Sequence, residues 1–291
     1  MKEKTWTSCT KVFDFGKINN NNSNIYPDYY NTGDGKFSVD EDSFSIADAR
    51  IYIVPKGCWN GGFVPYGNYI SFDVDLSQMD ATTQGNLYLT GPGGNSGGSH
   101  GQTPDAGQPY YCDANKDKSQ AQYWCPEIDL FEGNLCGFHS TWHGCDTVGP
   151  SDSNIGCDGD GKAGGGGNTS TSGFVRFKHG DYNTDINSSQ PFTVIVGFPG
   201  RNTPVMWVKL IQGTNEIYLE NDYGDEKPKL LDHLKLGWTL TSSNWFNQDH
   251  SPLDWLNGKC ISGVQGIPPT FTLSKMYYNK IPKSWRGPQD M

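Results

Sequence analysis

The chain has 291 residues, of which 34% are hydrophobic, and carries a formal net charge of −10 with an isoelectric point near 4.9. This length can bury one large core. Nucleic acids and anionic membrane surfaces bind to clustered cations, and the acidic balance of this chain argues against such clusters. We therefore expect a neutral polymer as the partner, and neither a nucleic acid nor a membrane. No run approaches the roughly 18 apolar residues of a membrane-spanning helix.

Short runs of alternating apolar and polar residues recur along the chain and predict β-strands joined by turns. The clearest runs are 69–74, 86–90 and 192–196. Patches rich in glycine or asparagine predict loops at 19–22, 91–101 and 164–167. The last two lie on either side of the acidic strand described below and are expected to border one cleft. Helical periodicity, internal repeats and a linker are all lacking, so we expect a single all-β domain over residues 1–291.

Cysteine usage indicates the compartment. The chain has eight cysteines and no CxxC pair, together with Asn-X-Ser/Thr sequons at Asn21, Asn168 and Asn187. This combination favours an oxidising, extracellular environment over a metal-binding cytosolic one. The opening residues lack the apolar run of a secretory signal. We therefore expect a mature, secreted glycoprotein segment behind an initiator methionine.

Three carboxylates, Glu127, Asp129 and Glu132, lie within six positions of a sparsely charged, aromatic-rich stretch. Side chains alternate along a strand, so Glu127 and Asp129 emerge on the same face about 6.6 Å apart. Glu132 has the wrong parity for that face. A single β-bulge between Asp129 and Glu132 would restore it, because one extra residue turns every later side chain to the opposite face. The sequence thus predicts a bulged strand that carries three acids on one surface.

Such a surface suits the chemistry of glycosidases. Adjacent carboxylates repel, so one of the outer pair, Glu127 or Glu132, is expected to hold a proton near neutral pH. Retaining glycosidases place two carboxyl groups about 5 to 5.5 Å apart, where one attacks the anomeric carbon and the other protonates the leaving oxygen. For three acids spaced in this way without further context, a solvated polar face on an edge strand would be the favoured interpretation. The surrounding sequence favours the glycosidase.

That surrounding sequence resembles glycoside hydrolase family 7, the cellobiohydrolases and endoglucanases that are related in fold to the family 16 β-glucanases. The run Cys125-Pro126-Glu127-Ile128-Asp129-Leu130-Phe131-Glu132-Gly133-Asn134 is similar to the family's Cys-Ser-Glu-Met-Asp-Ile-Trp-Glu-Ala-Asn. Other similar segments, in family order, are 71–78 with 85–89, Tyr111-Cys112-Asp113, His143 eleven residues after Glu132, Ser243-Asn244-Trp245, 253–257 and 260–273. The resemblance spans roughly residues 37–280 and leaves residues 1–36 unmatched.

The resemblance implies an all-β fold, a β-jelly roll sandwich of two antiparallel sheets with a concave substrate cleft. It assigns Glu127 as nucleophile, Glu132 as general acid and base, Asp129 as their helper and His143 as a supporting residue. No cofactor and no metal are needed for this chemistry. The residues that it implies for substrate binding are Tyr88, Tyr111, Asp113, Asn115, Trp245 and Trp255.

Some of these residues have a second interpretation. Alternation does not say which face of the strand is concave, so Tyr88 fits the core as well as the cleft. Trp245 and Trp255 would suit a core too, but the polar residues around them favour stacking on sugar rings. His139 and His143 are spaced like a zinc pair on a helix, yet the neighbouring glycines and a β-branched threonine disfavour a helix. Asp158-Gly159-Asp160-Gly161 lacks the remaining ligands of a calcium loop and is expected to be a turn.

The family also implies disulfides. The bridges expected from the resemblance are Cys112 with Cys125 and Cys145 with Cys157. The partner of Cys260 stays open among Cys9, Cys58 and Cys136.

The sequence therefore predicts a secreted, monomeric, retaining endo-β-1,4-glucanase. We do not expect a chain of this length to carry the long loops that roof the family's tunnels, and the open cleft that results favours internal attack. Alternative substrates are mixed-linkage β-1,3/1,4-glucan, xyloglucan, xylan and chitosan. The alternative class is a non-catalytic β-glucan-binding protein, a lectin-like wall or coat protein on the same fold. Pro126 gives this alternative a physical basis, because a proline directly before Glu127 restricts the backbone there.

Overall fold

The structure is a computed structural model that describes residues 16–18, 23–29, 36–56, 62–90, 114, 126–143, 174–177, 185–200, 206–221, 232–247, 249, 251–257, 260 and 269–291. Within these ranges only the backbone is described for residues 23–29, Phe174, Arg176, Asn221, Trp255 and Asn257.

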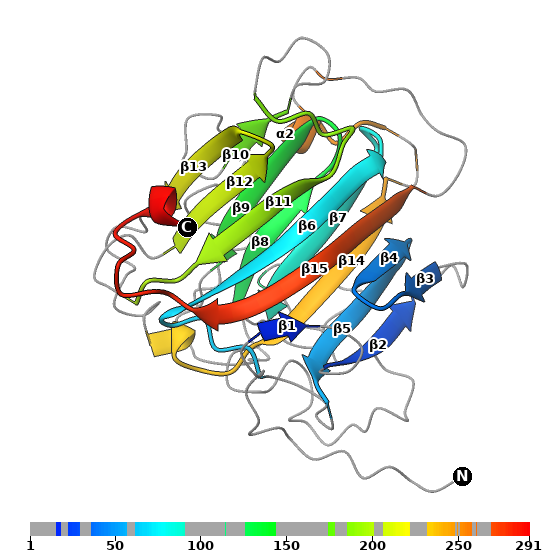
Figure 1. Ribbon diagram of the computed structural model, residues 1–291. Coiled ribbons are helices and arrows are strands. Elements are labelled where there is room, and N and C mark those ends of the chain that lie inside the picture. Colours follow the sequence, from blue (N-terminus) through cyan, green and yellow to red (C-terminus); the bar gives the residue numbers. More distant parts are fainter. Residues whose placement is uncertain are drawn as a thin grey trace, which may run out of the picture.

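Two stacked antiparallel sheets make up the fold (Figure 1). The first has the strand order β13-β12-β11-β6-β15-β4-β3, with β1 beside β15, and the second has the order β10-β9-β8-β7-β14-β5-β2. The strands of the first sheet are β1 (Gly16–Ile18), β3 (Lys36–Val39), β4 (Ser43–Ala47), β6 (Asn68–Gln78), β11 (Phe192–Gly197), β12 (Met206–Gln212), β13 (Asn215–Asn221) and β15 (Thr270–Lys280). Those of the second sheet are β2 (Ser23–Tyr29), β5 (Ala49–Pro55), β7 (Thr83–Thr90), β8 (Glu127–Gly133), β9 (Gly137–His143), β10 (Phe174–Arg176) and β14 (Thr239–Phe246).

This architecture confirms the predicted jelly roll. The alternating runs at 69–74, 86–90 and 192–196 lie in β6, β7 and β11. Short helical segments occur at α2 (Asp254–Asn257) and η3 (Pro288–Asp290). In the part of the chain that the structure describes, no helix is both long and apolar enough to cross a membrane.

The core fills the space between the sheets. Along β6, the residues Ile70, Phe72 and Val74 are fully buried, while the residues between them are half-buried. Phe131 of the second sheet meets Phe72 edge-on at 6.4 Å between ring centroids and stacks on Phe271 at 5.7 Å. Burying each such side chain is worth about 1.5 to 3 kcal/mol. These contacts fix which face of the second sheet looks inward.

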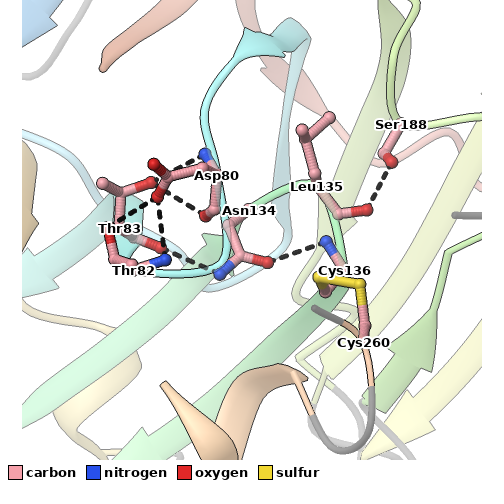
Figure 2. Close-up of a disulfide and its surroundings, with 8 residues drawn as sticks. All are labelled: Asp80, Thr82, Thr83, Asn134, Leu135, Cys136, Ser188 and Cys260. Atoms are coloured by element: carbon pink, nitrogen blue, oxygen red, sulfur yellow. Dashed lines mark hydrogen bonds between the residues drawn. A yellow bond between two sulfur atoms is a disulfide. The ribbon is translucent and has the colours of Figure 1, made fainter. Parts of the chain in front are cut away.

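A disulfide ties the β8–β9 hairpin to the later part of the chain (Figure 2). It joins Cys136 to Cys260, which are 124 positions apart, and so decides among the three partners left open for Cys260. The side-chain oxygen of Asn134 accepts a hydrogen bond from the backbone N–H of Cys136 at 2.8 Å, and its amide nitrogen donates to the carbonyl of Thr83 at 2.9 Å. The hairpin turn is therefore anchored to the start of β7. The predicted bridges of Cys112, Cys125, Cys145 and Cys157 lie outside the described residues, as do Cys9 and Cys58.

Candidate active site

A β-bulge interrupts β8 where the sequence predicts one. Asp129 pairs with Thr141 of β9, but Glu132 pairs with His139, so two residues of β8 face one residue of β9. The pairing of β8 with β7 shifts at the same place. The hydroxyl of Ser140, the single residue opposite the bulge, donates a hydrogen bond to the carbonyl of Asp129 at 3.0 Å. The predicted bulge is confirmed.

The bulge sends two consecutive side chains into the core. Leu130 and Phe131 are both fully buried in the main hydrophobic cluster, together with Ile128. Parity is thereby reset after Phe131, and Glu132 emerges on the face opposite the core. That face also carries Glu127 and Asp129, so the three carboxyl groups share one surface of the second sheet.

Register identifies their neighbours, because directly opposite residues of an antiparallel pair share a face. On β7, Thr90 lies opposite Glu127, Tyr88 opposite Asp129 and Asn86 opposite Glu132. Tyr88 is buried beside Tyr52 in a small cluster separate from the main core. The structure thus places Tyr88 on the acidic face and outside the main core, while its role in substrate binding stays a prediction.

Pro126 leaves Glu127 in register with both neighbouring strands. Glu127 directly follows it and pairs with Thr90 on one side and His143 on the other. The carboxyl of Glu127 is 9% exposed and its Oε2 accepts a hydrogen bond from the backbone N–H of Ala114 at 3.3 Å. The backbone restriction that Pro126 imposes therefore does not disturb the pairing of Glu127 with β7 and β9.

His143 and Asp129 form a close pair, with His143 Nε2 at 2.8 Å from Asp129 Oδ2. Burial alone would lower the pKa of His143. The hydrogen bond to Asp129 and the charges of Asp129, Glu127 and Glu132 act in the opposite direction and raise its pKa to about 10. At neutral pH the imidazole is therefore a cation, which keeps a positive charge among three acids.

Glu132 is the carboxyl that retains a proton. Burial raises its pKa to about 8, and the negative charge of Asp129 adds to this, whereas the charge of His143 opposes it. Glu132, one of the two outer acids that the sequence left open, therefore carries a proton at neutral pH.

Several residues of this face were not anticipated from the sequence. The side-chain amide of Gln84 lies 2.6 Å from Glu132 Oε1, and Thr141 Oγ1 lies 3.5 Å from Glu132 Oε2. Arg50, which is 4% exposed, donates from Nε to the hydroxyl of Tyr88 at 3.1 Å. Two features of the sequence could have pointed to these residues. Gln84 lies four positions before Tyr88, an even number, so both side chains emerge on the same face of a strand. Arg50 is a charged residue directly before an apolar run.

The remaining predicted binding residues divide into two groups. Trp245 lies opposite Gln84 on β14, is half-buried and stands outside the main core cluster. Trp255 belongs to α2, but its side chain lies outside the described residues. Tyr111, Asp113 and Asn115 lie outside them as well.

The two histidines of the superficial zinc pattern sit on a strand. His139 and His143 both belong to β9, as the disfavoured helix led us to expect. Among the residues with described side chains, no group of three or more histidine, cysteine, aspartate or glutamate residues is arranged to hold a metal ion. The sequence Asp158-Gly159-Asp160-Gly161 lies outside the described residues.

The chain shares sequence with fungal cellulases. Endoglucanase EG-1 of Hypocrea jecorina is 30% identical over 171 residues, which is 53% of this chain and 34% of that protein. Endoglucanase EG-1 of Trichoderma longibrachiatum is 33% identical over 172 residues, covering 53% of this chain and 33% of that protein. The match therefore spans about a third of these relatives. No model of a known protein family matches the chain.

Solved structures share the fold. The native endocellulase EGI of Humicola insolens superimposes with a TM-score of 0.62 at 17% identity, covering 86% of this chain and 79% of that one. A family 7 cellobiohydrolase from Daphnia pulex gives a TM-score of 0.61 at 16% identity, with 87% and 82% covered. An endoglucanase I complexed with cellobiose gives 0.60 at 18% identity, with 86% and 79% covered. These likenesses establish a common architecture.

Proposed function

We propose that this chain is a divergent member of glycoside hydrolase family 7 and a retaining endo-β-1,4-glucanase that acts on a cellulose-like glucan. The observation that carries the proposal is the bulge of β8, since it brings a proton-bearing Glu132 onto the same face as Glu127. The two carboxyl groups are expected to lie about 5 to 5.5 Å apart, the separation of a retaining pair.

In the first step the carboxylate of Glu127 attacks the anomeric carbon while Glu132 gives its proton to the departing glycosidic oxygen. The bond from the anomeric carbon to that oxygen breaks and an ester bond to Glu127 forms. In the second step Glu132, now ionised, takes a proton from water, whose oxygen displaces Glu127. The initial product keeps the β configuration.

Asp129 and His143 act on the proton of Glu132. The charge of Asp129 raises the pKa of Glu132, which favours the protonated acid before the first step. The cationic His143 lies 2.8 Å from the carboxyl of Asp129 and so places a positive charge beside the acids. His143 also lowers the cost of ionising Glu132 when it becomes the base.

The glucan is proposed to lie across β7 and β14, where polar and aromatic side chains share the acidic face. Trp245 offers an aromatic surface for a sugar ring. Tyr88, fixed by Arg50, offers a phenol beside Asp129. The second candidate substrate is mixed-linkage β-1,3/1,4-glucan, and the further candidates are xyloglucan, xylan and chitosan. We also propose that the protein is secreted and monomeric, and that it cleaves the glucan internally in an open cleft.

Hydrolysis tests the proposal directly. Wild-type protein should release reducing sugars from soluble β-1,4-glucan, with the initial product in the β configuration by proton NMR. Glu127→Gln should bind the same glucan without release. Glu220→Gln, which removes an exposed carboxylate from β13, is the matched control and should keep full activity. Binding without release by wild-type protein on all five polymers would favour the lectin-like alternative, and an initial α product would exclude retention.

Glycosylation has a separate test at Asn187. This sequon residue lies in the turn before β11, and its side-chain oxygen accepts hydrogen bonds from the backbone N–H and hydroxyl of Ser189 at 3.1 and 2.7 Å. Peptide mass spectrometry of protein expressed through a eukaryotic secretory pathway should detect a glycan on Asn187. The Ser189→Ala variant, which lacks the sequon hydroxyl, should not carry it.

A further inference from the structure

We propose that Trp245, Asn86 and Gln84 form a hydrogen-bonded relay that holds Glu132 in its protonated form, so that the two amides are positioning residues for the acid/base carboxyl. This inference rests on the proposed function and adds to it a control of the proton by residues up to two strands away from Glu132.

The contacts form a continuous chain. The amide of Gln84 lies 2.6 Å from Glu132 Oε1 and 2.6 Å from the amide of Asn86. The amide of Asn86 in turn lies 3.0 Å from the hydroxyl of Ser243 and 3.1 Å from the indole nitrogen of Trp245. Gln84 and Asn86 are 2% and 6% exposed, so water competes little for these hydrogen bonds.

The indole N–H decides the direction of the chain, because it can only donate. It requires an acceptor, and Asn86 supplies one when its amide oxygen faces Trp245 and Ser243. The amide nitrogen of Asn86 then faces Gln84 at 2.6 Å and the carbonyl of Gly85 at 3.1 Å. Two nitrogens at 2.6 Å would repel, so Gln84 has to present its oxygen there.

With the Gln84 amide turned in this way, its oxygen replaces Nε2 at 2.6 Å from Glu132 Oε1. Two acceptors at 2.6 Å are compatible only if a proton lies between them, and Glu132 is the group that carries it. The indole N–H of Trp245 thus fixes the orientation of the Asn86 and Gln84 amides, and this orientation favours the protonated carboxyl of Glu132. Burial and the charge of Asp129 favour the same state by raising the pKa of Glu132, whereas a Gln84 amide that donates from Nε2 lowers that pKa and opposes it.

The opposite orientation suits the ionised carboxyl. Gln84 then donates from Nε2 to both Glu132 and Asn86, and Asn86 donates to Ser243. In this state the indole N–H of Trp245 faces a nitrogen of Asn86. In this orientation Gln84 Oε1 points away from Glu132 and Asn86 and has no hydrogen-bond partner among the described residues. After the amide turns over, the nitrogen occupies that same position, again without a partner. The difference between the two orientations therefore comes from Trp245 alone. Loss of the proton from Glu132 therefore requires both amides to turn over together.

Trp245→Phe provides the critical test, because it keeps an aromatic ring and removes the donor. The titration of the Glu132 carboxyl carbon is followed by carbon-13 NMR in glutamate-labelled protein, with Glu132→Gln to assign the signal. We expect the proton affinity of Glu132 to fall about tenfold in Trp245→Phe, as one hydrogen bond favouring the protonated form is lost. Gln84→Met, which keeps the volume but has no acceptor, should lower it similarly.

The activity profile gives a second measurement. The alkaline limb of kcat/KM should move to lower pH in both variants. Ser45→Ala is the matched control, because it removes a 2.8 Å side-chain hydrogen bond to Thr272 in the other sheet, and it should leave the titration and the profile unchanged.

An unchanged titration of Glu132 in Trp245→Phe, even with a raised KM, would overturn the relay and leave Trp245 a stacking residue. A higher proton affinity would overturn it as well, since it would mean that Gln84 donates to Glu132. Trp245 is half-buried, so this variant decides the question even where Gln84→Met fails to fold. The NMR titration of Glu132 does not depend on catalytic activity. A wild-type protein that hydrolyses no glucan would refute the proposed function while the NMR result still decides the relay.

Discussion

Replacing Glu132 by glutamine should stabilise the folded protein, and increasingly so at alkaline pH. The pKa of this carboxyl rises from 4.5 to about 8 in the fold, chiefly because of burial. A group with a raised pKa contributes stability that is complete below its unfolded pKa and is lost as the pH rises through the folded pKa. Wild-type protein therefore loses this contribution between about pH 4.5 and 8, whereas glutamine never ionises.

The size of the effect follows from that displacement. At about 1.4 kcal/mol for each pKa unit, the change from 4.5 to about 8 corresponds to roughly 5 kcal/mol. Glu132 is only partly shielded from water, so screening reduces the expected gain in the free energy of unfolding to about 2 to 3 kcal/mol at pH 9. Near pH 4 the two proteins should be almost equally stable.

Urea unfolding of both proteins at pH 4, 7 and 9 measures this difference, and Glu220→Gln controls for the change in net charge. A difference between Glu132→Gln and wild type that does not grow with pH would refute the reasoning. A loss of stability in the variant at pH 9 would do so as well, because it would mean that the fold favours the ionised carboxyl.

Three further outcomes are expected. His143→Gln should move the alkaline limb of kcat/KM to higher pH, because the histidine charge lowers the pKa of the acid/base carboxyl; an unmoved limb would contradict this. Replacing both Cys136 and Cys260 by alanine should lower the free energy of unfolding in urea by up to about 5 kcal/mol, since the bridge closes a loop over 124 positions; a loss under about 1 kcal/mol would argue against chain entropy as its main effect. Gly85→Ala should cost about 1 to 3 kcal/mol in thermal or urea unfolding, because the added methyl collides with the buried ring of Phe271; an unchanged stability would mean that this ring yields freely.

Parity explains how much of the site was predictable. The spacing of Glu127, Asp129 and Glu132 requires a bulge if they share a face, so the irregularity could be located from three residues. Alternation gives only relative faces, however. Whether Tyr88 lay in the core or the cleft depended on pairing with β8, which sequence does not contain.

Other features depend on contacts between distant segments. Gln84 carries no distinctive chemistry, and it becomes part of the site only because β7 pairs with β8 and brings its amide to Glu132. The partner of Cys260 was undetermined because closing a long loop depends on the whole topology rather than on spacing. Alternating periodicity predicted an all-β chain and the family resemblance implied the two-sheet sandwich, whereas the strand order depends on pairings between distant segments.

The bulge makes β8 unequally tolerant of changes in length. Leu130 and Phe131 enter the core together where a regular strand would send one side chain. Deleting Leu130 would leave Glu132 on the acidic face of a now regular strand and remove one core anchor. Inserting a residue at the same point would also leave Glu132 on the acidic face of a regular strand, because Glu132 would then lie four positions after Asp129. It would, however, move Glu132 two positions along β9, away from His139. Length variants of this strand that keep Glu132 opposite His139 should therefore be one residue shorter at this point and not one residue longer.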